Sequence, residues 1–394
     1  MVGPPKVHTS SHFEAGTDAQ HKITCIDHKD DLLAIGVCCY GSPQWTGQVE
    51  LWKAMAEDDG LSACQIGKID VGSGVADVQI INEHWVLLST HAGFWALLDT
   101  LNFKCVCRGV EHTSCVTSFS MSPSGKFVAT SSVDGNVKVW DIQKWSKTKP
   151  TLATSIKDTE VVSSCVTCWQ GDQLSRSHGG RVNKVLWKTD DEWISAGGDG
   201  TIRVWNGAGE LIGRAYSDTQ FNCLSFVDNK RRVLLAGDEN GFVSVYDLAN
   251  RKVPGDGLDP AESLKISAFP LNASPGVMNP YQPPAFYTNL HHRNVYCPYP
   301  ITSINMVSLN KSLDDELPTA IVTHATPGAG LYEVDAYKRA GKHAQLLRPL
   351  RMVSEKLLRE EKTISTGVLC TKDAKFIVVG RKVFTAHPSS KVWG

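Results

Sequence analysis

The stretch from Cys115 to Lys144 constrains the fold more than any other part of the chain, because it predicts consecutive short strands joined by tight turns. Polar and apolar residues alternate from Val116 to Met121, and an apolar run follows at Phe127–Thr130. Asp134-Gly135 then leads into a second alternating run, Val137–Asp141. An Asp-Gly pair between alternating segments predicts a β-hairpin, because its turn needs residues that tolerate positive φ.

The same unit of short strands recurs along the chain. Five clear copies and two weaker ones begin at Ile23, Val75, Val116, Val182, Phe221, Ile301 and Ile364. Repeats of about 40–45 residues that each form four strands are typical of β-propellers. A propeller closes on itself and leaves few exposed sheet edges, so weak copies are tolerated. We therefore predict an all-β chain that forms one seven-bladed propeller.

The ending Val139-Trp140-Asp141 resembles the signature of WD repeats, and His112 precedes it at the distance where that family places a buried histidine. The resemblance implies a hydrogen-bonded chain of a histidine, a Ser or Thr, the turn aspartate and the Trp. The corresponding residues here are His112, Ser131 or Ser132, Asp134 and Trp140 in the third copy, with Asp199 and Trp205 in the fourth.

The predicted organisation is a flexible tail at 1–20 followed by the propeller at 21–394. Ring closure uses either the end of this tail or the C-terminal Lys391-Val392-Trp393. Residues 254–300 are the richest in proline, and proline cannot donate to a sheet ladder, so we predict an extended insertion on one face. Long loops of this kind often bind partners. Lys338–Lys362 has leucines at helical spacing and predicts a short helix.

Composition excludes several classes of function. The formal net charge of −1 gives no overall basic footprint of the kind that nucleic-acid binders carry. The first residues contain no apolar leader segment, and no apolar run is long enough to span a membrane. Without a leader, the 12 cysteines are predicted to be reduced thiols within strands. These features predict a cytoplasmic and nuclear protein.

No catalytic or metal-binding motif is present, so we predict no enzyme activity, cofactor or metal. The sequence has no phosphate-binding loop, nucleophile elbow or zincin motif. Cys165 and Cys168 have CxxC spacing but no second ligand pair at a suitable distance, so buried thiols are expected. His291-His292 and the basic run at 338–343 are expected to be solvated. Asp134 and Asp199 lie in hairpin turns, which favours structural roles.

A loop at Gly41–Gly47 interrupts the first copy where a short hairpin is expected. Its residues Ser42, Pro43, Gln44 and Trp45 are the predicted partner-binding site. An exposed Trp on a rigid loop is a strong interface anchor, because it buries a large area at a small entropic cost. The alternative is that Trp45 packs against its own blade.

Four segments resemble the WD-repeat subunits of methylosomes, namely Leu32–Lys53, Gly74–Val78, Glu111-His112 and Gly237–Gly241. The resemblance implies a non-catalytic adaptor for the symmetric-dimethylating protein arginine methyltransferase, with histones or RNA-processing proteins as substrates. It also implies that Trp45 enters the methyltransferase's TIM-barrel domain. The family has an Arg two residues earlier, where this chain has Pro43.

Two other classes of function stay open at this stage. One is a structural subunit of a large assembly, such as the propellers of the nuclear pore Y-complex, which also have an irregular first blade. The other is an enzyme built on a propeller, which the missing catalytic motifs disfavour. Co-purification with a methyltransferase or with nucleoporins separates the first two hypotheses.

Overall fold

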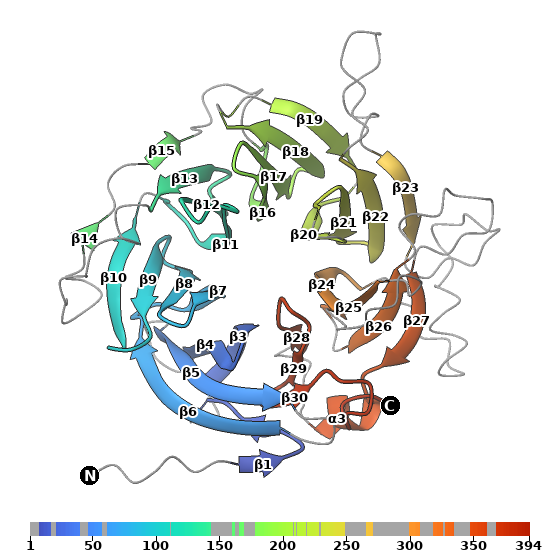
Figure 1. Cartoon of the computed structure of the whole chain (residues 1–394). Helices are drawn as coiled ribbons and strands as arrows, with labels where there is room; N and C mark the ends of the chain where they lie inside the picture. The colour runs from blue at the N-terminus through green and yellow to red at the C-terminus, as the bar shows by residue number, and fades with distance from the viewer. Residues whose placement is uncertain are drawn as a thin grey trace.

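In the computed structural model, seven β-sheets stand around a common axis as the blades of a closed ring (Figure 1). This arrangement confirms the predicted all-β, seven-bladed propeller. The structure describes residues 8–16, 21–39, 46–56, 61–110, 112–142, 160–161, 165–168, 178–207, 209, 211–217, 219–227, 230–248, 265–270, 299–307, 318–325, 328–334, 347–360 and 368–394.

The strands of a blade pair in chain order from the axis outward, apart from two strands of the N-terminal segment that lie at the outer edges of blades one and seven. Blade one holds β3 (His21–Lys29), β4 (Leu32–Cys39), β5 (Thr46–Ala56) and β6 (Leu61–Asp70). Blade two holds β7 (Val75–Asn82), β8 (Trp85–Thr90), β9 (Trp95–Asp99) and β10 (Lys104–Gly109). Blade three holds β11 (Val116–Met121), β12 (Phe127–Ser132), β13 (Val137–Asp141) and β15 (Cys165–Cys168).

The remaining blades repeat this order. Blade four holds β16 (Val182–Thr189), β17 (Glu192–Gly197), β18 (Thr201–Asn206) and β19 (Leu211–Tyr216). Blade five holds β20 (Phe221–Phe226), β21 (Val233–Asp238), β22 (Phe242–Asp247) and β23 (Lys265–Pro270). Blade six holds β24 (Ile301–Val307), β25 (Thr319–His324), β26 (Gly328–Val334) and β27 (Leu347–Met352). Blade seven holds β28 (Val368–Cys370), β29 (Phe376–Val379), β30 (Lys382–Thr385) and, from the other end of the chain, β2 (Phe13–Glu14).

The predicted Asp-Gly hairpins join the second and third strands of blades three and four. Gly135 and Gly200 have φ values of 84° and 73°, which a side chain would strain. Trp140 and Trp205 therefore occupy third strands, β13 and β18, opposite Val128 and Trp193. Their matching positions agree with the repeat predicted from the sequence.

The hydrophobic core is divided among the junctions between blades. Seven clusters of buried residues each combine side chains of two neighbouring blades, so that every junction has its own cluster. Trp140 is fully buried between blades two and three, and Trp205 is buried between blades three and four. Each blade therefore depends on both of its neighbours for burial of its apolar faces.

The N-terminal segment closes the ring. Phe13 and Glu14 of β2 pair antiparallel with Val383 and Lys382 of β30 and complete blade seven. The Phe13 ring packs against Trp52 of blade one at 4.5 Å between centroids. Just before β2, β1 (His8–Ser10) pairs with β6, so the same segment joins blades one and seven.

Glu50 fastens this segment to blade one. Its buried carboxylate accepts hydrogen bonds from the Gly16 backbone N–H at 3.2 Å, from Trp52 Nε1 at 3.1 Å and from Gln48 Nε2 at 3.0 Å. Trp393, in the C-terminal segment, forms a β-bridge with Val353 and is not part of a blade strand. Closure therefore uses the N-terminal candidate.

The predicted tail and the predicted insertion both contain strands. The expectation of a flexible tail is wrong for 8–10, because a strand this short carries too little pattern to be recognised. The pairing of 13–14 with blade seven agrees with the alternative in which the end of the tail closes the ring. Within the predicted insertion at 254–300, β23 forms the outer strand of blade five. The rest of that segment lies outside the described residues, apart from 299–300, so its role as an insertion stays a prediction.

Two further elements lie outside the regular pattern. The strand β14 (Glu160–Val161) pairs in parallel with β10 and adds a fifth strand to blade two. The predicted short helix is present as α3 (Glu355–Glu360), with Leu357 and Leu358 packed against the cluster between blades six and seven. In the part of the chain that the structure describes, no helix has the length and apolar character needed to cross a membrane.

Candidate functional site

A buried chain of hydrogen bonds runs through blade three from the indole of Trp140 to the turn at Asp134. Trp140 Nε1 donates to Thr130 Oγ1 at 2.9 Å, and Thr130 Oγ1 lies 2.8 Å from His112 Nε2. His112 Nδ1 lies 2.9 Å from Asp134 Oδ2. Asp134 Oδ2 also accepts from the Thr113 N–H at 3.1 Å. The histidine, aspartate and Trp named from the sequence are therefore brought together.

The hydroxyl in this chain comes from Thr130, which corrects the expectation of Ser131 or Ser132. Trp140 pairs with Val128, so Thr130 is the next residue along the same strand face and is within reach of the indole. Ser132 lies farther along that face, at the end of the strand. Its hydroxyl instead accepts from the Asp134 N–H at 3.1 Å and donates to the Ser114 carbonyl at 3.2 Å.

Blade four contains the same arrangement with two residues that sequence reasoning missed. Trp205 Nε1 donates to Ser195 Oγ at 2.9 Å, and Ser195 Oγ lies 2.7 Å from His178 Nε2. His178 Nδ1 lies 3.0 Å from Asp199 Oδ1. His178 precedes Asp199 by 21 residues and His112 precedes Asp134 by 22, so this spacing could have identified His178.

The electrostatics favour ionised aspartates in both turns. Burial opposes ionisation of Asp134, but hydrogen bonds from His112 and from backbone N–H groups outweigh it and lower its pKa to about 2. Asp199 is also buried in part, and its bonds from His178, Gly179 and Thr201 hold its pKa well below the usual range. Each carboxylate is therefore charged at neutral pH and acts as a hydrogen-bond acceptor.

Burial lowers the pKa of His178, which favours the neutral imidazole. A neutral ring donates from one nitrogen and accepts at the other. With Nδ1 donating to Asp199, Nε2 accepts from Ser195, and Ser195 accepts from Trp205. Every donor in this hydrogen-bond network of blade four thus has an acceptor.

These networks cannot reach a substrate from their present positions. The His112 and His178 side chains are each only 1% exposed, and their partners Asp134 and Asp199 are 6% and 14% exposed. A general acid or base must come within hydrogen-bond distance of the reacting group. We infer that His112, Asp134, Trp140, Asp199 and Trp205 stabilise their blades, together with Thr130, His178 and Ser195.

The predicted partner-binding residues Ser42, Pro43, Gln44 and Trp45 lie outside the described residues, so the anchor role stays a prediction. The strand that follows them packs tightly against blade two. A Cβ at Gly47 would lie 2.4 Å from the Ser73 carbonyl oxygen and 3.0 Å from Gly74 Cα. The first-blade loop therefore leads into β5 directly beside the connection to blade two.

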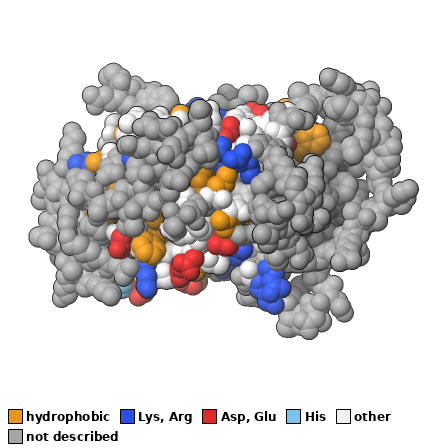
Figure 2. Space-filling view, turned by 90° about the horizontal axis from the view of Figure 1, so that it is seen from above, with side chains coloured by type: hydrophobic (Ala, Val, Ile, Leu, Met, Phe, Trp, Pro, Cys, Tyr) orange, Lys and Arg blue, Asp and Glu red, His pale blue; other side chains and the backbone are white. Residues whose placement is uncertain are grey.

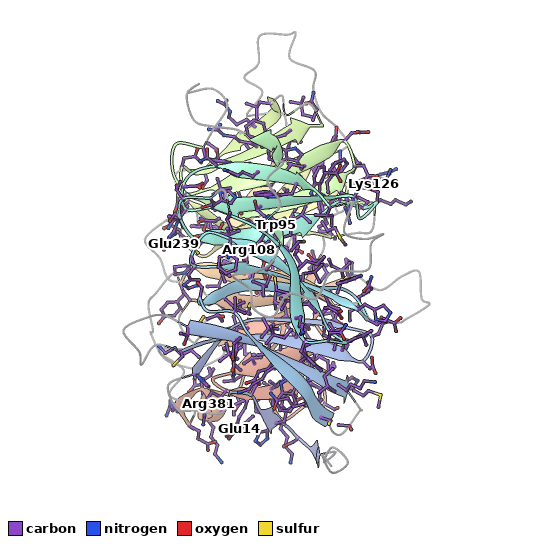
Figure 3. The ribbon with its side chains drawn as sticks, turned by 90° about the vertical axis from the view of Figure 1, so that its left-hand side faces the viewer. Glu14, Trp95, Arg108, Lys126, Glu239 and Arg381 are labelled. Atoms are coloured by element: carbon purple, nitrogen blue, oxygen red, sulfur yellow. The ribbon has the colours of Figure 1, made fainter. Side chains whose placement is uncertain are left out.

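Turns lie at the two faces of the ring, and the rim carries side chains of mixed type. Lys126 and Glu239, from turns at opposite ends of their blades, lie at opposite faces of the disc (Figure 3). Basic and acidic side chains are interspersed with hydrophobic ones on the side of the ring near β19 (Figure 2). The exposed large hydrophobic side chains in the described ranges are Met55, Leu101, Val110, Val133 and Leu350.

Metal binding has no support in the described part of the chain, where no group of three His, Cys, Asp or Glu side chains is placed to hold an ion. The side chains of Cys165 and Cys168 are not among the described ones, nor are His291, His292 and the basic run at 338–343. Cys25, Cys223 and Cys370 are buried free thiols, and burial raises their pKa.

Comparison with known proteins agrees with this fold. Residues 103–141 and 163–206 match the family described as "WD domain, G-beta repeat". The solved structure described as "Crystal structure of RRP9 WD40 repeats" aligns with a TM-score of 0.60 and 13% identity. The alignment covers 95% of this chain and 92% of that one, a likeness that concerns the fold alone.

Two curated relatives share part of the sequence. The ribosome biogenesis protein YTM1 of Coprinopsis cinerea is 28% identical over 191 residues, which is 43% of this chain and 42% of that protein. A ribosome biogenesis protein WDR12 homolog of Trichoplax adhaerens is 22% identical over 242 residues, which is 57% of this chain and 52% of that protein. The chain thus spans about half the length of these relatives.

Proposed function

Because the chain is a seven-bladed WD-repeat β-propeller, we propose that it is a non-catalytic scaffold that binds other proteins through its loops. The observation that carries this proposal is that the His–Asp pairs of blades three and four are buried and hold the blades together. The two His–Asp pairs in blades three and four face the blade interiors and join strands to turns. The connecting turns are what the ring presents on its two faces.

We propose ribosome assembly as the setting of this scaffold, with proteins as its direct partners and the nucleus as its location. The support is the sequence similarity to two proteins named as ribosome biogenesis factors. A formal net charge of −1 favours protein partners over direct binding of an RNA backbone. This setting replaces the methyltransferase complex as the first candidate.

A methyltransferase adaptor is the second candidate, and one observation favours it. Two of the segments that resemble methylosome subunits are Leu32–Lys53 and Gly74–Val78. They lie in contact through Gly47 and the connection before β7. A partner that recognises Trp45 would therefore meet both segments at one place on the ring. Histones or RNA-processing proteins would then be the substrates presented to the enzyme.

Affinity purification of the tagged full-length chain, followed by mass spectrometry, tests these candidates together. Enrichment of ribosome assembly factors is expected from the first proposal. Enrichment of an arginine methyltransferase that is lost in Trp45→Ala would favour the second. Recovery of nucleoporins as the main partners would contradict both and favour a pore subunit. A measurable turnover of substrate by the purified chain alone would contradict the scaffold role.

A further inference from the structure

Lys372 of blade seven contacts two blades that are not its neighbours along the chain. It lies in the turn between β28 and β29, and its Nζ donates to the Val78 carbonyl at 3.1 Å. The same Nζ lies 3.8 Å from Asp77 Oδ1 and 5.1 Å from the ring of Phe119. Val78 and Asp77 belong to blade two, and Phe119 belongs to blade three. Since blade one stands between blades seven and two, this side chain bypasses a whole blade.

Asp77 extends the contact to a fourth blade. Its second oxygen, Oδ2, lies 3.7 Å from Nζ of Lys184 in β16 of blade four. The Asp77 side chain is 15% exposed and that of Lys184 is 23% exposed. Ion pairs with limited exposure are screened less by salt than surface pairs. One carboxylate thus lies between two lysines that come from opposite directions.

The next residue of the turn binds blade one. Asp373 Oδ2 lies 2.6 Å from Nδ1 of His28, whose side chain is 3% exposed. Beside them, the buried Asp27 of blade one accepts from the Ile80 N–H of blade two at 2.7 Å. The turn Lys372-Asp373 therefore contacts both blades that follow blade seven around the ring.

We propose that Lys372 is a latch that holds the closing blade in the ring from the side of the axis. Asp77 is its ion-pair partner, and Lys184 holds Asp77 in place from blade four. Blade seven needs such support because its outer strand β2 has only two residues and comes from the far end of the chain. The latch connects blade seven to blades two and three without relying on that strand. Blade seven is then held on its inner side by the latch and on its outer side by β2.

Hydrogen exchange of the full-length chain tests the latch through Lys372→Met. The amides of β29 and β30 are expected to exchange at least about tenfold faster, while those of blades four and five keep their rates. Lys375→Met is the matched control, because Lys375 lies in the same turn and, among the described residues, its Nζ forms an ion pair with Asp373 alone, at 3.7 Å and on the surface. It should leave all rates unchanged.

Two more variants keep the test decisive if Lys372→Met is poorly folded. Lys372→Arg retains the charge and should restore protection of blade seven. Asp77→Asn should raise exchange in blade seven, and combining it with Lys372→Met should add little further change, as expected for partners. Equal effects of Lys372→Met and Lys375→Met would overturn the proposal. So would a uniform increase in every blade, or additive effects of the two partners.

Discussion

Replacing Thr130 by Val tests whether its hydroxyl is the hub of the blade-three network. The change removes one oxygen at nearly constant volume. Trp140 Nε1 and His112 Nε2 then lose the atom that lies 2.9 and 2.8 Å away from them. Thr130 and Trp140 have no measurable exposure, so water cannot replace the lost partner.

The magnitude follows from the cost of buried polar atoms without partners, which is ~1–3 kcal/mol each. Two such atoms predict a loss of about 2–6 kcal/mol in the free energy of unfolding. Folded proteins are stable by only about 5–15 kcal/mol, so the loss should be easily measured. Urea unfolding followed by Trp fluorescence gives the midpoint and the free energy.

Two control variants separate the hydroxyl from its surroundings. Thr130→Ser keeps the oxygen and loses a buried methyl group, so it should cost only about 1 kcal/mol. Ser132→Ala removes the hydroxyl that the sequence suggested, which holds the Asp134 turn but does not touch the indole. It should cost less than Thr130→Val. A Thr130→Val protein as stable as wild type would refute the hub, as would a larger loss from Ser132→Ala.

Four further predictions concern the attachment of the N-terminal segment, the pH dependence of stability and the first-blade loop. Glu50→Ala leaves three donors without their acceptor, so limited proteolysis at 8–16 should accelerate, and an unchanged rate would show that the carboxylate is not needed. Burial raises the pKa of Asp27 from 3.8 to about 6, so its contribution to stability is present below pH 4 and lost as pH rises through 6. Asn at this position should flatten that part of the stability curve. Asp134 has its pKa lowered to about 2, so its contribution is present above pH 4 and lost as pH falls through 2, which acid unfolding of Asp134→Asn would test. Trp45→Ala should leave the melting temperature unchanged and weaken partner binding by about thirtyfold in calorimetry, whereas unfolding would identify Trp45 as a packing residue.

The fold was largely predictable because its information is local and repeated. Each hairpin carries its own alternation and turn residues, and the repeat then indicates a ring. The strand that closes the ring was less predictable, because β2 consists only of Phe13 and Glu14, and two residues are too few to show the alternation of a strand. Its position depends on a partner at the other end of the sequence. The strand β23 was hidden for another reason, since it lies in a segment rich in proline.

The candidate site was predictable where residue types are distinctive. At their expected positions no neighbouring residue offers the same side chain as His112, Asp134 or Trp140. By contrast, residues 130–132 all carry a hydroxyl group, and the network uses only one of them. Only the pairing of Trp140 with Val128 decides among them. The contacts of Lys372 with blade two could not be foreseen, because a lysine in a turn is ordinarily solvated and its partners Asp77 and Val78 lie some 295 residues earlier.

Closure by β2 also sets an order of events during synthesis. The ribosome makes Phe13 370 residues before its partner Val383. Ribosomes add roughly 5–20 residues per second, so roughly 20–70 s pass between the two. Throughout that time the outer strand of the last blade has been made and has no sheet to join. The backbone edge of β2 then has no partner strand and is available to chaperones, and a nascent chain halted before β30 should still bind them.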